Sequence, residues 1–138
     1  GQEFGATTGR ARRCGWLDIV LVRQSVRTSG IAALAITKLD VLTGIDRLKI
    51  CVGYKHKNGE FTQAVPANIE LLSQCEPIYE EFAGWKESII HARTMAELPV
   101  NARKYLKRME ALAGAKINLV SVGAGREETI IIKDPFRN

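Results

Sequence analysis

Two threonines framed by glycines lead directly into three arginines near the start of the chain, in the run Gly5-Ala6-Thr7-Thr8-Gly9-Arg10-Ala11-Arg12-Arg13. Glycine lets the backbone turn its N–H groups toward a ligand, and threonine hydroxyls add short-range hydrogen bonds. Guanidinium groups bind carboxylates or phosphates through paired hydrogen bonds. A solvated basic turn is the alternative, but the position just ahead of a predicted helix favours an anion-binding loop.

A second candidate loop, Thr37-Lys38-Leu39-Asp40, follows the apolar run from Ile31 to Ile36. An aspartate carboxylate can accept hydrogen bonds from both the ring N–H and the exocyclic amine of guanine, while the lysine stem can lie along the base plane. Ligands of open α/β sheets bind at the carboxyl ends of strands, which supports this interpretation. Four residues of this kind are common at ordinary strand ends, so the motif alone favours a purely structural role.

A third candidate loop, Ser121-Val122-Gly123-Ala124-Gly125-Arg126, follows another apolar run. Its backbone N–H groups and serine hydroxyl could close over a base, and a plain turn between strands is the equal alternative. The sequence contains no GxxxxGK[ST] run. A bound nucleotide would therefore not have its phosphates cradled by this chain alone.

Alternating helical and strand patterns position these loops. Asp18 is a candidate helix N-cap and Gly30 a helix stop, Asn58-Gly59 is a hairpin signal, and Gly114 ends a helix that follows Pro99. Pro66 to Trp85 has no firm assignment beyond a short helix. The predicted order is helix 16–27, strand 31–36, hairpin strands 48–54 and 61–65, helix 68–74, helix 100–112, and strands 117–122 and 129–132. This order predicts an α/β layer with an antiparallel β-hairpin extension.

Composition narrows the class of protein. The 138 residues suit one domain, and the net charge of +5 is mild because acidic residues are interspersed, so nucleic-acid binding is possible but not favoured. Cys14, Cys51 and Cys75 show no CxxC spacing, and His56 and His91 have no ligand-like neighbours, which predicts a reducing, cytosolic setting and no metal site. No apolar run approaches the roughly 20 residues that span a bilayer, and no signal segment opens the chain. We expect a protein that is neither secreted nor membrane-bound.

Aromatic residues between the loops allow two interpretations. Trp85, with Tyr79 and Phe82, could stack on a base, but aromatic side chains near proline and glycine are more often core or loop anchors. His91 is better explained as a surface histidine than as a general base.

Five ordered segments together resemble the C-terminal part of adenylosuccinate synthetase: GQEFGATTGRARRCGWLD, TKLDVLTGIDRLKICVGYK, PIYEEFAGW, LPVNARKYLKRMEALAG and VSVGAGREETIIIKDPF. The resemblance spans essentially the whole chain. It implies a cytoplasmic, homodimeric ligase of purine (AMP) biosynthesis that uses magnesium as cofactor. The implied reaction joins IMP and L-aspartate through the intermediate 6-phosphoryl-IMP, while GTP is converted to GDP and phosphate. It also implies strands and covering helices from the C-terminal part of a P-loop-type mixed sheet.

The resemblance assigns roles to residues of the three loops. The implied aspartate loop is Ala6, Thr7, Thr8, Gly9, Arg10, Ala11 and Arg12. Arg10 would also contact IMP, and Arg12 would be shared between aspartate and the GTP phosphates. The implied guanine-binding residues are Lys38, Leu39 and Asp40, with Ser121, Val122 and Gly123 completing the pocket. Ala11 stands where the family often carries another residue.

The family's phosphate-binding glycine loop, catalytic aspartate, catalytic histidine and magnesium ligands lie in its N-terminal part, and none of those motifs is present here. We therefore expect residues 1–138 to be a single-domain fragment, about the last third of the enzyme, with no catalytic residue or metal ligand of its own and no turnover alone. Two alternatives remain: a guanine-nucleotide-binding module without catalysis, and, less favoured, a basic nucleic-acid-binding domain.

Overall fold

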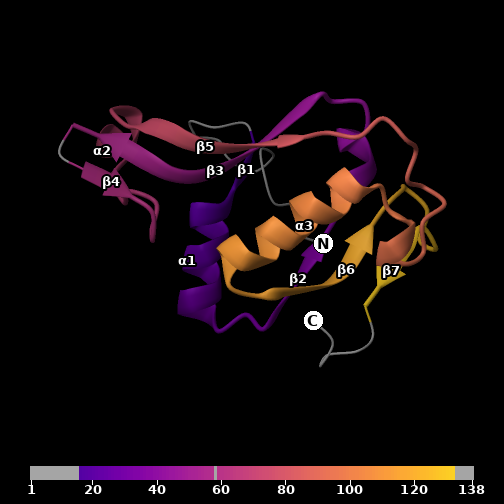
Figure 1. The fold of residues 1–138 in the computed structure, drawn as a ribbon. Coiled ribbons are helices and arrows are strands. Elements are labelled where there is room, and N and C mark those ends of the chain that lie inside the picture. Colours follow the sequence, from indigo (N-terminus) through magenta and orange to yellow (C-terminus); the bar gives the residue numbers. More distant parts are fainter. Residues whose placement is uncertain (1–15, 58, 133–138) are drawn as a thin grey trace.

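Two β-sheets organise the part of the chain that the computed structural model describes, residues 16–57 and 59–132 (Figure 1). The first sheet contains β1 (Leu17–Asp18), β3 (Arg47–His56), β4 (Gly59–Phe61) and β5 (Glu76–Ala83). In it, β1 runs parallel to β3, whereas β4 and β5 run antiparallel to β3. The second sheet contains β2 (Ala33–Ile36), β6 (Lys116–Ser121) and β7 (Thr129–Ile131). The predicted mixed α/β fold with an antiparallel hairpin is thereby confirmed.

The second sheet places two loops at one edge. Strands β2 and β6 are parallel, with Ala33 opposite Lys116 and Ile36 opposite Val120. Strand β7 is antiparallel to β6 and pairs with its last residues, Ser121 opposite Thr129. Because parallel neighbours end on the same side of a sheet, the segments that follow Ile36 and Ser121 leave from one edge.

The helices begin and end near the predicted residues. Helix α1 (Ile19–Ser29) is capped by Asp18 and ends at Gly30, whose φ of 66° is left-handed. Helix α2 (Ile69–Ser73) is capped by Asn68, and α3 (Val100–Ala113) follows Pro99 and ends at left-handed Gly114. Two 3₁₀ turns, η2 (Leu39–Leu42) and η3 (Met95–Glu97), complete the elements of the described segments. Trp16 was expected to open the first helix, but Leu17–Asp18 pairs with β3 instead, because Asp18 has the extended backbone of an N-cap.

Two further strands, β4 and β5, differ from the prediction. The sequence showed no strand between Pro66 and Trp85, yet β5 lies there, along the edge of β3 opposite β1 and β4. No β5 residue is fully buried, so the strand lacks a clear apolar alternation. Strand β4 ends at Phe61 rather than continuing to residue 65, because α1 arginines bind the next carbonyls: Arg23 donates to Thr62 O, and Arg27 donates to Gln63 O at 2.7 Å.

Helix α3 lies between the two sheets and packs against α1, β5 and β6 (Figure 1). Its buried face, Ala102, Tyr105, Leu106, Met109 and Ala113, joins the main core with residues of α1, β2 and β6. A second cluster, Val20, Cys51, Tyr54, Leu72 and Cys75, lies between α1, β3 and α2. Both described cysteines are buried and outside any disulfide among the described residues, which fits packing roles.

Burial raises the pKa of Tyr105, on this face of α3, from 10.0 to about 12. Below pH 10 the Tyr105 phenol is neutral in both the folded and the unfolded protein, so it adds no pH dependence to the free energy of unfolding. Above pH 10 the unfolded chain loses this proton while the folded protein keeps it, so stability falls. We expect the free energy of unfolding to fall, relative to Tyr105→Phe, by about 1.4 kcal/mol per pH unit from pH 10 toward 12. Urea titrations of both proteins test this, and parallel pH curves would contradict it.

Candidate functional site

Two of the three predicted loops meet at the edge where β2 and β6 end. The pairing of Ile36 with Val120 brings the segment 37–40 beside the segment 121–125, and η2 packs against β6. The expected ligand side of this sheet therefore carries the predicted guanine-binding residues from both loops. The predicted aspartate loop, Ala6 to Arg12, lies outside the described residues.

Lys38 and Asp40 are held by an unusual backbone and a buried neighbour. Lys38 has φ 61° and ψ 37°, and it is the one non-glycine residue with positive φ in the described segments. Leu39 is buried, whereas Asp40 is partly exposed in the first turn of η2. The Asp40 carboxylate accepts no hydrogen bond from any described residue. A left-handed lysine costs free energy, and such strain clusters at binding sites.

The left-handed conformation of Lys38 predicts an inverted order of stability for two substitutions. Glycine adopts positive φ without a Cβ penalty, so we expect Lys38→Gly to be more stable than Lys38→Ala by about 1 kcal/mol. In the exposed interior of α3, at Lys104, glycine should be less stable than alanine by about 1 kcal/mol. Urea unfolding of the four variants measures both differences. If glycine were less stable than alanine at both positions, the backbone strain at Lys38 would be negligible.

The segment from Ser121 to Gly125 forms a closed turn. The Ser121 hydroxyl donates to Gly123 O at 3.1 Å, and buried Val122 donates its N–H to Glu128 O at 2.9 Å. The Gly125 N–H donates to the Glu128 carboxylate at 2.8 Å. Within residues 16–57 and 59–132, the N–H groups of Gly123 and Ala124 have no acceptor. These two amides are thus available to a ligand.

Trp85 anchors the segment that carries Asp40. Its indole N–H donates to the Thr43 hydroxyl at 2.9 Å, and its carbonyl accepts from Gly44 N–H at 2.8 Å. The side chain is only 2% exposed and packs against Tyr105, so it is an anchor and does not present a face to a base. The core interpretation of this tryptophan is confirmed, and His91 is exposed as expected.

The carboxylates with lowered pKa lie elsewhere. A hydrogen bond from Lys86 lowers the pKa of Asp46, and a hydrogen bond from Arg108 lowers the pKa of Glu80. Backbone N–H groups of Arg93 and Thr94 lower the pKa of Glu97 in a capping box. These groups are exposed or partly exposed, and their interactions are those of a protein surface.

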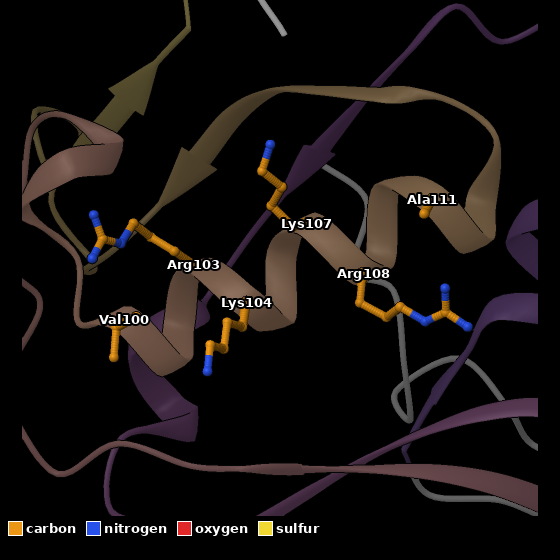
Figure 2. A pocket seen from close by; sticks show the side chains of 6 residues that line it. All are labelled: Val100, Arg103, Lys104, Lys107, Arg108 and Ala111. Carbon is orange, nitrogen blue, oxygen red and sulfur yellow. The ribbon is translucent and has the colours of Figure 1, made fainter.

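A shallow groove of about 570 Å³ runs along the outer face of α3 and is lined by Val100, Arg103, Lys104, Lys107, Arg108 and Ala111 (Figure 2). All six residues come from this one helix, and Arg108 is committed to Glu80 through two hydrogen bonds of 2.6 and 3.0 Å. The groove contains none of the predicted site residues. With no second element converging on it, it lacks the enclosure of a nucleotide pocket.

Across residues 16–57 and 59–132, no three His, Cys, Asp or Glu side chains gather in a way that could hold a metal ion. In the same part of the chain, no helix has both the length and the apolar character needed to cross a membrane.

The chain is similar to known adenylosuccinate synthetases. The family model described as adenylosuccinate synthetase matches residues 1–130. An adenylosuccinate synthetase from Syntrophus aciditrophicus is 65% identical over 136 residues, which are 99% of this chain and 32% of that protein. One from Caldanaerobacter subterraneus is 54% identical over 134 residues, covering 97% of this chain and 31% of that protein.

A solved structure, described as fully ligated adenylosuccinate synthetase from Plasmodium falciparum, superposes with a TM-score of 0.82 at 39% identity. The match covers 94% of this chain and 31% of that one. The chain thus spans about a third of the length of the curated relatives it matches. The family match, the identities and the shared fold establish that this chain belongs to the adenylosuccinate synthetase family.

Proposed function

We propose that residues 1–138 are the C-terminal, substrate-binding part of an adenylosuccinate synthetase, a GTP-dependent carbon–nitrogen ligase of purine biosynthesis. One observation carries the proposal beyond family membership. The parallel pairing of β2 with β6 brings Lys38 and Asp40 to the same sheet edge as Ser121 and Gly123. A carboxylate and two available amides at such an edge match the hydrogen-bonding groups of guanine.

In this proposal two loops bind guanine, and the third binds aspartate, IMP and the GTP phosphates. The Asp40 carboxylate accepts hydrogen bonds from guanine N1–H and the 2-amino group, and the Lys38 stem lies along the base. Leu39 holds this pair from the core, while Ser121, Val122 and Gly123 close the pocket. Arg10 binds the aspartate substrate and IMP, and Arg12 binds aspartate and the GTP phosphates, because guanidinium groups pair with carboxylate and phosphate oxygens. The rest of the aspartate loop is Ala6, Thr7, Thr8, Gly9 and Ala11.

The proposed reaction transfers the γ-phosphoryl group of GTP to the 6-oxygen of IMP, and the aspartate amine then displaces that phosphate. GDP, phosphate and adenylosuccinate are the products. In full-length members of the family, magnesium supports the phosphoryl transfer. The described residues of this chain do not fit a magnesium site. We place the metal ligands, the phosphate loop and the catalytic groups in the remainder of a complete synthetase. We also propose that the complete synthetase is a cytoplasmic homodimer.

A graft tests this function. Residues 1–138 would replace the matching third of the Syntrophus aciditrophicus protein, to which they are 65% identical. We expect the graft to form adenylosuccinate from IMP and aspartate with GTP, and not with ATP at the same concentration. The truncated recipient without a graft is the control. A folded graft that is inactive, or that uses ATP as well as GTP, would contradict the proposal.

A second candidate is a binding module without catalysis, favoured because both halves of the proposed guanine pocket lie within this chain. Calorimetry on the isolated chain with GTP and with ATP separates the two nucleotides. A heat of binding for GTP alone would support a self-contained guanine pocket. Equal or absent responses would show that the pocket needs the rest of the synthetase.

A further inference from the structure

Glu128 links both arms of the turn that follows β6. Its backbone carbonyl accepts from Val122 N–H at 2.9 Å, and its backbone N–H donates to Gly125 O at 3.0 Å. Its side chain returns into the same turn, where Oε1 accepts from Gly125 N–H at 2.8 Å. Three hydrogen bonds from one residue thus close the segment from 122 to 128, one of them to a carboxylate.

The carboxylate lies against the glycines of the turn. A Cβ on Gly123 would stand 2.2 Å from Oε1 of Glu128 and 2.7 Å from its Cδ. A Cβ on Gly125 would stand 3.2 Å from the same Oε1. Neither glycine has positive φ, so backbone conformation does not require glycine at residue 123, but a side chain there would displace the Glu128 carboxylate. Gly123 and Glu128 therefore form one packed unit.

This unit borders the proposed guanine pocket. The Glu128 carboxylate accepts a hydrogen bond from the N–H of Gly125. The N–H groups of Gly123 and Ala124 have no acceptor among the described residues. The Ser121 hydroxyl is likewise held, by Gly123 O at 3.1 Å. The shape of the turn thus depends on contacts within it, and the Glu128 carboxylate reaches back from the far end of the turn to Gly125.

We propose that Glu128 is a positioning residue for guanine recognition. Its carboxylate holds the turn in the conformation that leaves the Gly123 and Ala124 amides to the base. This inference rests on the proposed function, because it assigns Glu128 a part in the same pocket. It concerns GTP alone, since neither IMP nor aspartate is assigned to this turn.

The test uses the grafted complete synthetase. We expect Glu128→Ala to raise the KM for GTP about tenfold, with kcat and the KM values for IMP and aspartate within about twofold. Glu128→Gln keeps an acceptor oxygen at the same place, so its KM for GTP should stay within about threefold of the parent. Glu127→Ala, at the exposed neighbouring residue, is the matched control and should change nothing.

A paired substitution separates this role from direct contact between Gly123 and the base. Gly123→Ala should raise the KM for GTP, because the new methyl meets the carboxylate. Adding Glu128→Ala to that variant should cause no further rise, since carboxylate and methyl compete for the same space. Two rises that multiply would overturn the proposal.

Three further results are decisive. A graft that uses GTP with an unchanged KM in Glu128→Ala overturns only the positioning role of Glu128. A fall in kcat together with equal rises in the KM values for GTP, IMP and aspartate in Glu128→Ala would indicate general misfolding. That result would also overturn the positioning role of Glu128. A parental graft that shows no preference for GTP overturns the proposed function, and the role of Glu128 with it.

Discussion

Asp40→Asn is expected to raise the KM for GTP about 10- to 100-fold in the grafted complete synthetase, with the KM for IMP and for aspartate unchanged. Guanine presents two donors, N1–H and the 2-amino group, and a carboxylate accepts both. Asparagine presents one acceptor and one NH₂ donor, so a donor of the base would face a donor of the protein. Losing a hydrogen bond to a charged group costs about 1.5–3 kcal/mol, which corresponds to this change in KM.

The same substitution should invert the choice of base. Xanthine has N1–H as donor and a 2-oxo group as acceptor, which complement the oxygen and the NH₂ of asparagine. We therefore expect Asp40→Asn to have a lower KM for xanthosine triphosphate than for GTP, the reverse of the parent. Steady-state kinetics with both nucleotides measure this. Asp46→Asn, at an exposed carboxylate that pairs with Lys86 at 2.6 Å, is the control. A parental preference retained in Asp40→Asn would remove Asp40 from the guanine site.

Asp18→Ala is expected to lower the free energy of unfolding by about 2–5 kcal/mol. Asp18 is only 2% exposed, and its Oδ1 accepts from the N–H groups of Val20 at 3.0 Å and Leu21 at 3.1 Å. Its Oδ2 accepts from the hydroxyl of buried Tyr54. Alanine would leave the first turn of α1 without its cap and the hydroxyl without its acceptor. Urea unfolding of the 138-residue chain measures the loss.

A double-mutant cycle with Tyr54→Phe isolates the buried contact. Tyr54→Phe alone should cost about 1–3 kcal/mol, because a carboxylate loses its donor. On the Asp18→Ala background the same change should cost less, since the contact between the hydroxyl and Asp18 is already lost. Thr28→Ala, near the exposed end of α1, is a control and should shift stability by less than about 0.5 kcal/mol. Additive losses in the cycle would show that Asp18 and Tyr54 do not act as a pair.

The cap at Asp18 also matters for the site. In sequence, Asp18 lies six residues after Arg12, the last residue of the proposed aspartate loop. It joins β1 to β3, through the pairing with Cys51, and begins α1. In the sequence, the proposed aspartate loop therefore precedes a buried, hydrogen-bonded junction. Fixed support is what positions substrate-binding groups in a catalytic site.

Local signals in the sequence were sufficient for most elements. Asp18 and Asn68 are side chains that accept hydrogen bonds from the first turn of a helix, and Gly30 and Gly114 adopt the left-handed conformation that ends one. Asn58-Gly59 predicted the hairpin between β3 and β4. Each of these choices is made by atoms within a few residues of one another, so the sequence alone determines them. The family resemblance, carried by motifs along the chain, was likewise readable without coordinates and is confirmed.

Only the tertiary structure decided the features that depend on distant partners. Strand β5 forms because β3 offers an open edge, although β5 itself buries little apolar surface. The left-handed backbone of Lys38 has no local signal, since lysine rarely adopts it without surrounding packing. Glu128 lacks a motif, and its role emerges only where its carboxylate meets Gly123 and Gly125. The meeting of residues 38–40 with 121–123 depends on the parallel pairing of β2 with β6, which lie about 80 residues apart, and no short-range pattern encodes such a contact.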